Sequence, residues 1–218
     1  MQNPFLIGLA ALLAIAGSAL GGDALWLHYV GKPLATVLML NLAWRAPQPV
    51  SPEYRRAVAS GLLMSLLGDV FLMLPQSVLG PGFELGLAAF LIAHLFFLRA
   101  LTRDAPLFGQ PWPLIVLLAV SAANLRLLWP GIGAALNVPV LAYMLCLVAM
   151  TAQAASRFLS LRTADSRLAA IGGLLFLMSD TSLAYNRFYA PLPASPLIVL
   201  GTYYLALYLI ARSVQRVK

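Results

Sequence analysis

Residues 57–74 read AVASGLLMSLLGDVFLML, an apolar run in which Asp69 is the single charged residue. A run of this length suits a membrane-spanning helix, which needs about 20 residues with a range of about 17–25. A second run of the same kind covers residues 168–186, LAAIGGLLFLMSDTSLAYN, and carries Asp180. Both runs therefore predict helices that place one carboxyl group inside a membrane.

The composition of the whole chain agrees with a membrane location. Of its 218 residues, 61% are hydrophobic and 10% are charged, and the mean hydropathy is +0.88. Soluble domains carry about 25% charged residues, so this chain could not cover a water-facing surface with polar groups. Only helices and closed barrels span a bilayer, and continuous rather than alternating apolar runs favour helices. We expect an all-α, polytopic integral membrane protein with a single domain over residues 1–218.

Eight apolar runs are candidates for membrane-spanning helices. The second should begin earlier than its apolar core, near Trp26, and Pro33 near its start suits a first helical turn. Residues 1–3 contain no basic residue, so we do not expect a cleavable secretory signal. The eight runs cover residues 4–22, 31–44, 57–74, 84–99, 112–129, 134–153, 168–186 and 196–212.

Lysine and arginine residues are divided unequally between the two sides of the membrane that these runs define. With the N-terminus inside, the outer connectors hold only Lys32, Arg126 and Arg187. The positive-inside rule then places both termini in the cytoplasm, and we expect the inner membrane of a bacterium. Topology also explains the net charge of +7 better than nucleic-acid binding does. The inner side holds Arg45, Arg55, Arg56, Arg99, Arg103, Arg157, Arg162, Arg167, Arg212, Arg216 and Lys218.

Three ionisable residues, Asp69, His94 and Asp180, lie well inside the runs. A charge at the bilayer centre costs about 2.5–3.5 kcal/mol on insertion scales, so each is a functional candidate, the alternative being a bond that joins helices. Asp69 and Asp180 each lie 12 residues after the start of an outward-running segment, which places them at one depth in the outer half. The strings GLLMSLLGD and GGLLFLMSD that end in them also align, as a 4+4 internal duplication would produce.

Two carboxyl groups in one dry site cannot both ionise cheaply, because each disfavours the charge on the other. The pair would therefore supply one acid and one base, as acid-assisted hydrolysis requires. We expect Asp180 to be the base, since the Ser179 and Thr181 hydroxyls would stabilise its ionised form, and Asp69 to be the acid. A proton- or cation-coupled transporter could use the same pair as a relay, and a non-catalytic lipid-binding or assembly protein could use it to join helices.

Further polar residues gather near the outer side. Cations and hydrogen-bond donors of this kind could hold a phosphate headgroup, although interfacial anchoring also explains single Lys, Arg and Tyr residues there. The candidate substrate-binding residues are Lys32, Glu84, His94, Arg126, Asn186, Arg187 and Tyr203.

No motif for a metal or cofactor is present in the sequence. It has no Gly-rich phosphate loop, no His-Glu-x-x-His pair and no Gly-x-Ser-x-Gly elbow. Two histidines and one cysteine argue against a zinc or iron site. Cys146 lies between Leu145 and Leu147, which is typical of a buried, inert thiol. We expect no cofactor.

Several strings around the two aspartates match a known pattern. They are residues 66–74 (LLGDVFLML), Phe83, Gly86-Leu87, Ala89-Phe90, Ala93-His94, residues 176–180 (FLMSD), Leu183-Ala184, Arg187-Phe188 and, more weakly, Lys32-Pro33-Leu34. These residues resemble the YhhN-like lysoplasmalogenase family over most of the chain. The Gly-Asp and Ser-Asp strings carry the specificity, because acidic residues are rare in membrane helices.

The resemblance implies an eight-span enzyme that hydrolyses the vinyl-ether bond of lysoplasmalogens, phospholipids that lack the sn-2 acyl chain. The products would be a fatty aldehyde and glycerophosphoethanolamine or glycerophosphocholine. The family's two essential aspartates would correspond to Asp69 and Asp180. A protonated Asp would give its proton to the alkene carbon, while the ionised partner stabilises the oxocarbenium ion and orients water. The expected partners are the lysophospholipid substrate and membrane lipids, and no nucleic acid.

Overall fold

The computed structural model describes residues 4–75 and 77–216, and the regular structure of these residues is helical. Each of the eight predicted runs falls on one α-helix, which confirms the all-α expectation. Short 3-10 turns cover Gly22–Ala24, Trp129–Gly131 and Ala134–Leu136. The α-helices are α1 (Pro4–Leu20), α2 (Leu25–Trp44), α3 (Pro52–Met73), α4 (Gly82–Leu101), α5 (Trp112–Leu128), α6 (Asn137–Leu161), α7 (Ala164–Phe188) and α8 (Ser195–Arg212).

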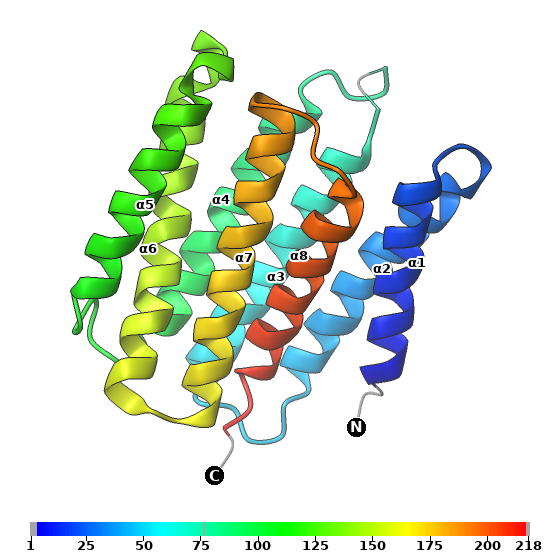
Figure 1. Cartoon of the computed structure of the whole chain (residues 1–218). Helices are drawn as coiled ribbons and strands as arrows, with labels where there is room; N and C mark the ends of the chain where they lie inside the picture. Colours follow the sequence, from blue (N-terminus) through cyan, green and yellow to red (C-terminus); the bar gives the residue numbers. More distant parts are fainter. Residues whose placement is uncertain (1–3, 76, 217–218) are drawn as a thin grey trace.

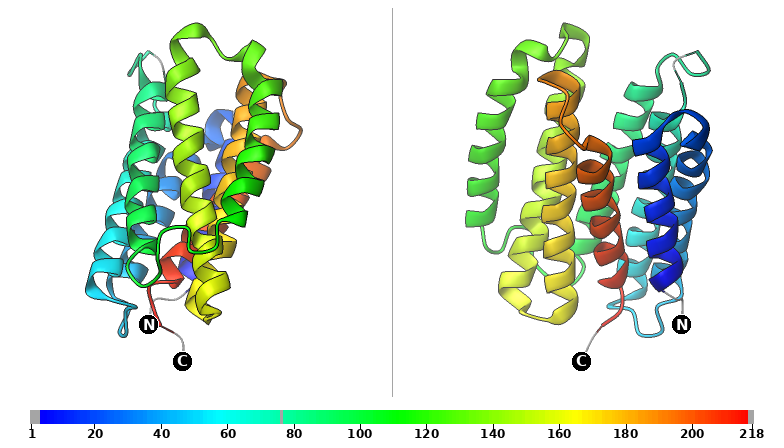
Figure 2. Two further views of the ribbon diagram at one scale, coloured as in Figure 1. Left: turned by 90° about the vertical axis from the view of Figure 1, so that its left-hand side faces the viewer. Right: turned by 45° about the vertical axis from the view of Figure 1, so that its right-hand side comes forward.

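The eight helices run alternately up and down, and both ends of the described chain lie at the same end of the bundle (Figure 1). The closest pairs along the chain are α1 with α2, α3 with α4, and α7 with α8. Helix α4 also packs on α6, and α2 packs on α3 and α8. Figure 2 shows α5 at one edge, against α6, and α1 at the other edge. Helices α3 and α7, which carry the two aspartates, therefore run in the same direction.

Six of the described helices, α3 to α8, are long and apolar enough to cross a membrane by length and composition, when α5 and α6 are taken with their adjoining 3-10 turns. Helix α1 is apolar but shorter, with 17 residues. Large apolar side chains such as Leu12, Ile115 and Met178 point outward and are exposed, as lipid-facing side chains are. This is the architecture of a polytopic helical membrane protein.

Helix α2 begins at Leu25, earlier than its apolar core, as expected from the sequence. Pro33 therefore lies inside the helix and not in its first turn, so that part of the prediction was wrong. A proline there has no N–H to donate to the carbonyl four residues earlier. The next residue toward the N-terminus, Lys32, is buried.

Polar caps fix the ends of the central helices at the end of the bundle where the described chain begins and stops. The Ser51 hydroxyl accepts a hydrogen bond from the Tyr54 amide at 3.0 Å and caps α3. Thr163 and Ser166 form a reciprocal capping box at the start of α7. Arg162, with φ of 53°, ends α6 in the left-handed conformation. These helices therefore extend beyond their apolar runs into polar turns.

Helices α3 and α4 approach one another closely because α3 presents glycine to aromatic rings. A Cβ atom on Gly61 would lie 2.3 Å from the Phe97 ring, and one on Gly68 would lie 2.6 Å from the Phe90 ring. Both distances are well inside van der Waals contact. Since Gly68 precedes Asp69, this packing fixes the position of the Asp69 backbone.

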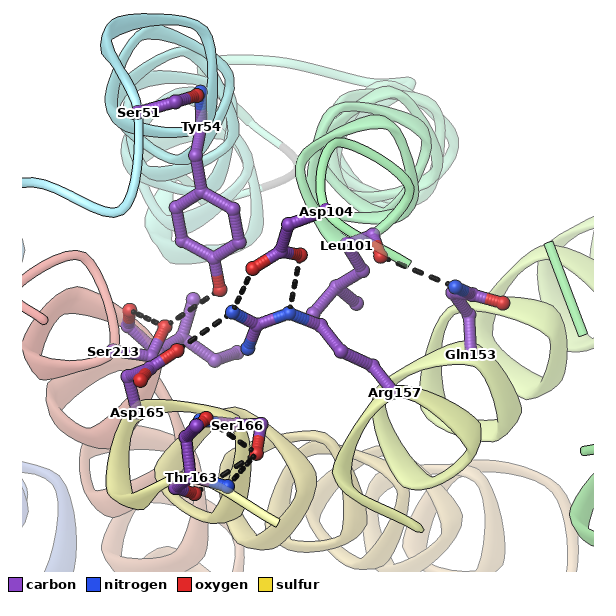
Figure 3. Close-up of polar contacts among 11 residues, drawn as sticks. Ser51, Tyr54, Leu101, Asp104, Gln153, Arg157, Thr163, Asp165, Ser166 and Ser213 are labelled. Atoms are coloured by element: carbon purple, nitrogen blue, oxygen red, sulfur yellow. Dashed lines mark hydrogen bonds and ion pairs between the residues drawn. The ribbon is translucent and has the colours of Figure 1, made fainter. Parts of the chain in front are cut away.

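A buried ion cluster joins the helices at the end of the bundle near the termini (Figure 3). The Arg157 guanidinium is fully buried and donates to Asp104 at 2.7 Å and to Asp165 at 2.6 Å. It also lies over the Tyr54 ring, 5.1 Å from the centroid. The Tyr54 hydroxyl is within 2.9 Å of the Ser213 hydroxyl. The topology argument treated Arg157 as a loop cation, but it is the centre of a cluster that ties α3, α6, α7 and the segment after α4 together.

Residues 1–3, on which the signal-peptide expectation depends, and Lys218, which entered the topology argument, lie outside the described residues.

Candidate active site

A cavity of about 330 Å³ opens at the end of the bundle away from the termini. Both Asp69 and Asp180 line it, so the structure brings the two predicted residues together at one site. Helices α2, α3, α4, α7 and α8 each contribute at least two lining side chains, α1 and α6 contribute one each, and α5 contributes none. The lining consists of Ser18, His28, Lys32, Asp69, Leu72, Phe83, Phe90, Tyr143, Ser179, Asp180, Leu183, Asn186, Arg187, Ser195, Pro196, Val199, Leu200 and Tyr203.

The Asp69 carboxyl group is surrounded by donors from two other helices. Its Oδ1 atom lies 3.2 Å from the Lys32 ammonium, and the two side chains are only 1% and 8% exposed. Its Oδ2 atom accepts hydrogen bonds from the Thr36 hydroxyl at 3.0 Å and the Tyr203 hydroxyl at 2.7 Å. One cation and two hydroxyl donors are the surroundings of an ionised carboxylate, because each of them stabilises negative charge.

The residues around Asp69 are placed by helical spacing. Lys32 and Thr36 are four residues apart, so α2 presents both on one face. The Thr36 hydroxyl also lies 3.4 Å from the Lys32 carbonyl. Tyr203 comes from the middle of α8 and packs edge-to-face against Phe90 and Phe176, which hold its ring.

The surroundings of Asp180 are different. The Tyr143 hydroxyl of α6 donates a hydrogen bond to its Oδ2 atom at 2.5 Å. Among the described residues, no Lys, Arg or His nitrogen lies within ion-pair distance of Asp180. The two carboxyl groups of the cavity therefore differ: Asp69 has a cation beside it, and Asp180 has a neutral donor.

Ser179, one of the two sequence neighbours that pointed to Asp180 as the ionised base, does not act as expected. The Ser179 hydroxyl donates to the Val199 carbonyl at 2.9 Å and so bonds α8 instead of Asp180. Asp69, whose sequence neighbours are apolar, acquires its cation from α2. The structure therefore gives the two aspartates partners from other helices, which the acid/base expectation did not take into account.

His94 lies behind the cavity and does not line it, which corrects its prediction as a substrate-binding residue. Its ring is fully buried and packs edge-to-face against Tyr143, with centroids 5.2 Å apart, and against Phe176, at 4.7 Å. Neither ring nitrogen has a hydrogen-bond partner among the described residues. His94 contacts the ring that carries the Asp180 donor, so its role in the site is indirect.

The other predicted substrate-binding residues divide into two groups. Lys32, Tyr203, Asn186 and Arg187 all line the cavity. Asn186 accepts a hydrogen bond from the Leu192 amide at 2.9 Å and so holds the segment before α8. The remaining two predictions, Glu84 and Arg126, are exposed and lie outside the lining. The structure therefore does not place these two side chains in the site that holds Asp69 and Asp180.

Two lining residues, Tyr143 and His28, were missed in the sequence, as was Thr36, which bonds Asp69 but does not line the cavity. Thr36 could have been found from its position one helical turn after Lys32. Tyr143 lies within an apolar run, and a buried tyrosine hydroxyl generally needs a partner. His28 lies in the part of α2 that precedes its apolar core, and its Nδ1 atom is 3.0 Å from the Ala14 carbonyl.

A smaller apolar hollow of about 70 Å³ continues from the cavity past Asp180. It shares Tyr143, Asp180 and Arg187 with the cavity and lies between α4, α6 and α7. The Arg187 guanidinium covers the Phe83 ring, 4.9 Å from its centroid, at this junction. The lining consists of Leu72, Phe83, Leu87, Phe90, Val140, Tyr143, Asp180, Leu183, Ala184, Arg187 and Phe188.

The fold and this cavity define a polytopic helical membrane protein with two carboxyl groups in one buried site. The chain belongs to the YhhN family, whose model matches residues 27–214. It is 31% identical over 193 residues to the human lysoplasmalogenase TMEM86B, covering 88% of this chain and 76% of the relative. It is 33% identical to a lysoplasmalogenase of Mycobacterium tuberculosis, covering 82% of this chain and 66% of that protein. It is 29% identical to the uncharacterized membrane protein YhhN of Escherichia coli O157:H7, covering 94% of both. No solved structure matches the chain.

Proposed function

We propose that this protein is a membrane-embedded lysoplasmalogenase, which hydrolyses the vinyl-ether bond of a lysoplasmalogen to a fatty aldehyde and glycerophosphoethanolamine or glycerophosphocholine. The names of the human and mycobacterial relatives support the reaction. The observation that carries the mechanism is the difference between the two carboxyl groups of one cavity: Asp69 pairs with the Lys32 ammonium, and Asp180 accepts a hydrogen bond from the Tyr143 hydroxyl.

In the proposed mechanism Asp180 is the acid and Asp69 is the carboxylate. Asp180 gives its proton to the alkenyl carbon that is not bonded to oxygen, and the π electrons of the alkene form the new C–H bond. The positive charge that develops on the other alkenyl carbon and the ether oxygen is stabilised by Asp69, which Lys32 keeps ionised. A site of this kind places opposite charges where the transition state needs them.

Water then completes the hydrolysis. It adds to the oxocarbenium carbon, and the proton that it loses returns to Asp180, which is thereby restored as the acid. The product of this step is a hemiacetal. In its collapse the hemiacetal hydroxyl loses its proton and forms the aldehyde carbonyl, and the bond between that carbon and the glycerol oxygen breaks, so that one proton is transferred overall from the hydroxyl to the glycerol oxygen. The balance needs one water molecule and no other reactant.

The two hollows suggest how the substrate lies. The apolar hollow between α4, α6 and α7 suits the alkenyl chain, because its lining is almost entirely hydrophobic and it reaches Asp180. The larger, more polar cavity suits the glycerophosphate part, with Arg187 at the junction as a phosphate ligand. Asn186 adds a polar group on the same side of α7.

We further propose that all eight helices cross the membrane as one domain, with both termini in the cytoplasm and the cavity in the outer half of a bacterial inner membrane. The unequal distribution of lysine and arginine supports this orientation. The parallel course of α3 and α7 and the similar strings ending in Asp69 and Asp180 support a 4+4 internal duplication.

The test is a measurement of aldehyde release by the purified protein in detergent with a lysoplasmalogen substrate. Asp69→Asn and Asp180→Asn should each reduce the rate at least about 10²-fold, because each removes a charge or proton needed in the transition state. Asp23→Asn is the matched control, since Asp23 is exposed and outside the cavity. Aldehyde release without an ion gradient separates hydrolysis from coupled transport, and folded wild-type protein that releases none would contradict the proposal.

A further inference from the structure

A second groove lies at the opposite end of the bundle, between the first turns of α3 and the last turn of α4. Its volume is about 300 Å³. None of its lining residues belongs to the cavity that holds Asp69 and Asp180, so the two sites are separate. The lining consists of Glu53, Arg56, Ala57, Ser60, Phe96, Arg99 and Arg103, and we call it the arginine groove.

The charges of the arginine groove are unbalanced. Glu53 pairs with Arg56, with 3.1 Å between the carboxylate and guanidinium atoms. Arg99 is in the last turn of α4 and Arg103 lies two residues beyond its end, and neither has an acidic partner within 4.0 Å among the described residues. Two guanidinium groups are therefore available to an anion, and planar guanidinium groups bind phosphate oxygens well.

The floor and the surroundings of the arginine groove are apolar. Ala57 and Ser60 are small, which leaves the hollow open, and Phe96 forms its other wall. Farther along the same face of each helix, Leu63 of α3 is 45% exposed and Ile92 of α4 is 42% exposed. A ligand of this groove would thus meet guanidinium groups at one end and a lipid-facing apolar surface at the other.

We propose that the arginine groove binds the phosphate of an anionic phospholipid from the membrane leaflet on the side of the termini, with an acyl chain along α3 and α4. Basic pockets between membrane helices on the cytoplasmic side are suited to such headgroups. The positive-inside rule explains why arginines lie at this end of the bundle. It does not explain why they line one hollow that continues into an apolar surface, which is the arrangement that a phospholipid requires. The proposal does not depend on the hydrolase reaction.

The test is native mass spectrometry of the full chain in detergent, titrated with phosphatidylglycerol, with phosphatidylcholine of the same chain length, or with inorganic phosphate. We expect phosphatidylglycerol to bind more tightly than phosphatidylcholine. Arg99→Gln and Arg103→Gln should each weaken its binding about fivefold, the effect of one basic residue at an anionic surface. Arg167→Gln is the matched control, because Arg167 is exposed at the same end but outside the groove.

Three outcomes would overturn the proposal. Equal weakening by Arg167→Gln would indicate diffuse surface charge, and inorganic phosphate that competes at a similar concentration would indicate a free-anion site. Equal affinity for the two lipids would exclude a charge-specific site. Thermal unfolding in phosphatidylcholine bicelles checks that each variant folds. Should Arg99→Gln unfold, Arg99→Lys replaces it, and we expect that variant to bind phosphatidylglycerol more tightly than Arg103→Gln does.

Discussion

Replacing Lys32 by methionine tests the ion pair on which the proposed site depends. Methionine keeps most of the apolar stem of lysine and removes the ammonium group 3.2 Å from Asp69. The two side chains are 8% and 1% exposed, so solvent cannot substitute for the lost cation. Removing one partner of a buried ion pair costs about 3–5 kcal/mol, because the other charge is left uncompensated. Asp69 could avoid that cost only by taking up a proton, and would then no longer be a carboxylate.

A double-mutant cycle of Lys32→Met and Asp69→Asn measures this coupling. Each single variant should lower the free energy of unfolding in detergent by about 3–5 kcal/mol, and the double variant should lose much less than the sum, because it leaves no unpaired charge. Lys32→Met should also reduce the rate of aldehyde release about 10²–10³-fold, the usual effect of losing one electrostatic group. Arg126→Met, an exposed cation outside the cavity, is the control. Additive losses of stability would refute the reasoning.

Three further predictions concern the surroundings of the site and the fold. Tyr143→Phe removes the hydrogen bond to Asp180 and should lower kcat about tenfold, a typical net hydrogen-bond contribution, with little change in KM; an unchanged kcat in steady-state kinetics would contradict this. Ala184→Phe fills the apolar hollow, so long-chain substrates should lose far more kcat/KM than short-chain ones, and an equal loss across chain lengths would speak against chain binding there. Arg157→Met leaves the buried Asp165 and the partly buried Asp104 without their cation and should lower stability by about 3–5 kcal/mol; thermal unfolding at the wild-type temperature would disprove that role.

The positions of the helices were predictable from the sequence because the bilayer requires long apolar runs. The ends of the helices were less predictable, since hydropathy marks the part of a helix inside the apolar layer of the membrane and not the polar turns beyond it. Helix α6, for example, continues to Leu161 through Ser156 and Arg157, which a hydropathy pattern excludes. Arg157 itself was assigned to a connector because no sequence pattern shows that Asp104 and Asp165 meet it in space.

The two aspartates were also predictable, because an acidic residue in an apolar helix is costly and therefore rare. The sequence could not show which face of each helix points toward the cavity, or which side chains of other helices contact the two aspartates. Glu84 and Arg126, for example, were expected near the site from their positions along the chain, but neither lines the cavity. The Asp69 partners come from α2 and α8, at sequence separations of 33 residues for Thr36 and 134 for Tyr203. Sequence neighbours alone therefore could not identify the partners of Asp69.

The kcat of the Asp69→Asn, Asp180→Asn double variant tests the central claim most directly. If the two carboxyl groups act as one acid and carboxylate pair, removing either disables the same step, and the effects are strongly non-additive. We expect the double variant to be no slower in aldehyde release than the slower single variant, within about threefold, as for groups that act as a unit. Losses that multiply would contradict a single paired site and show that Asp69 and Asp180 contribute independently.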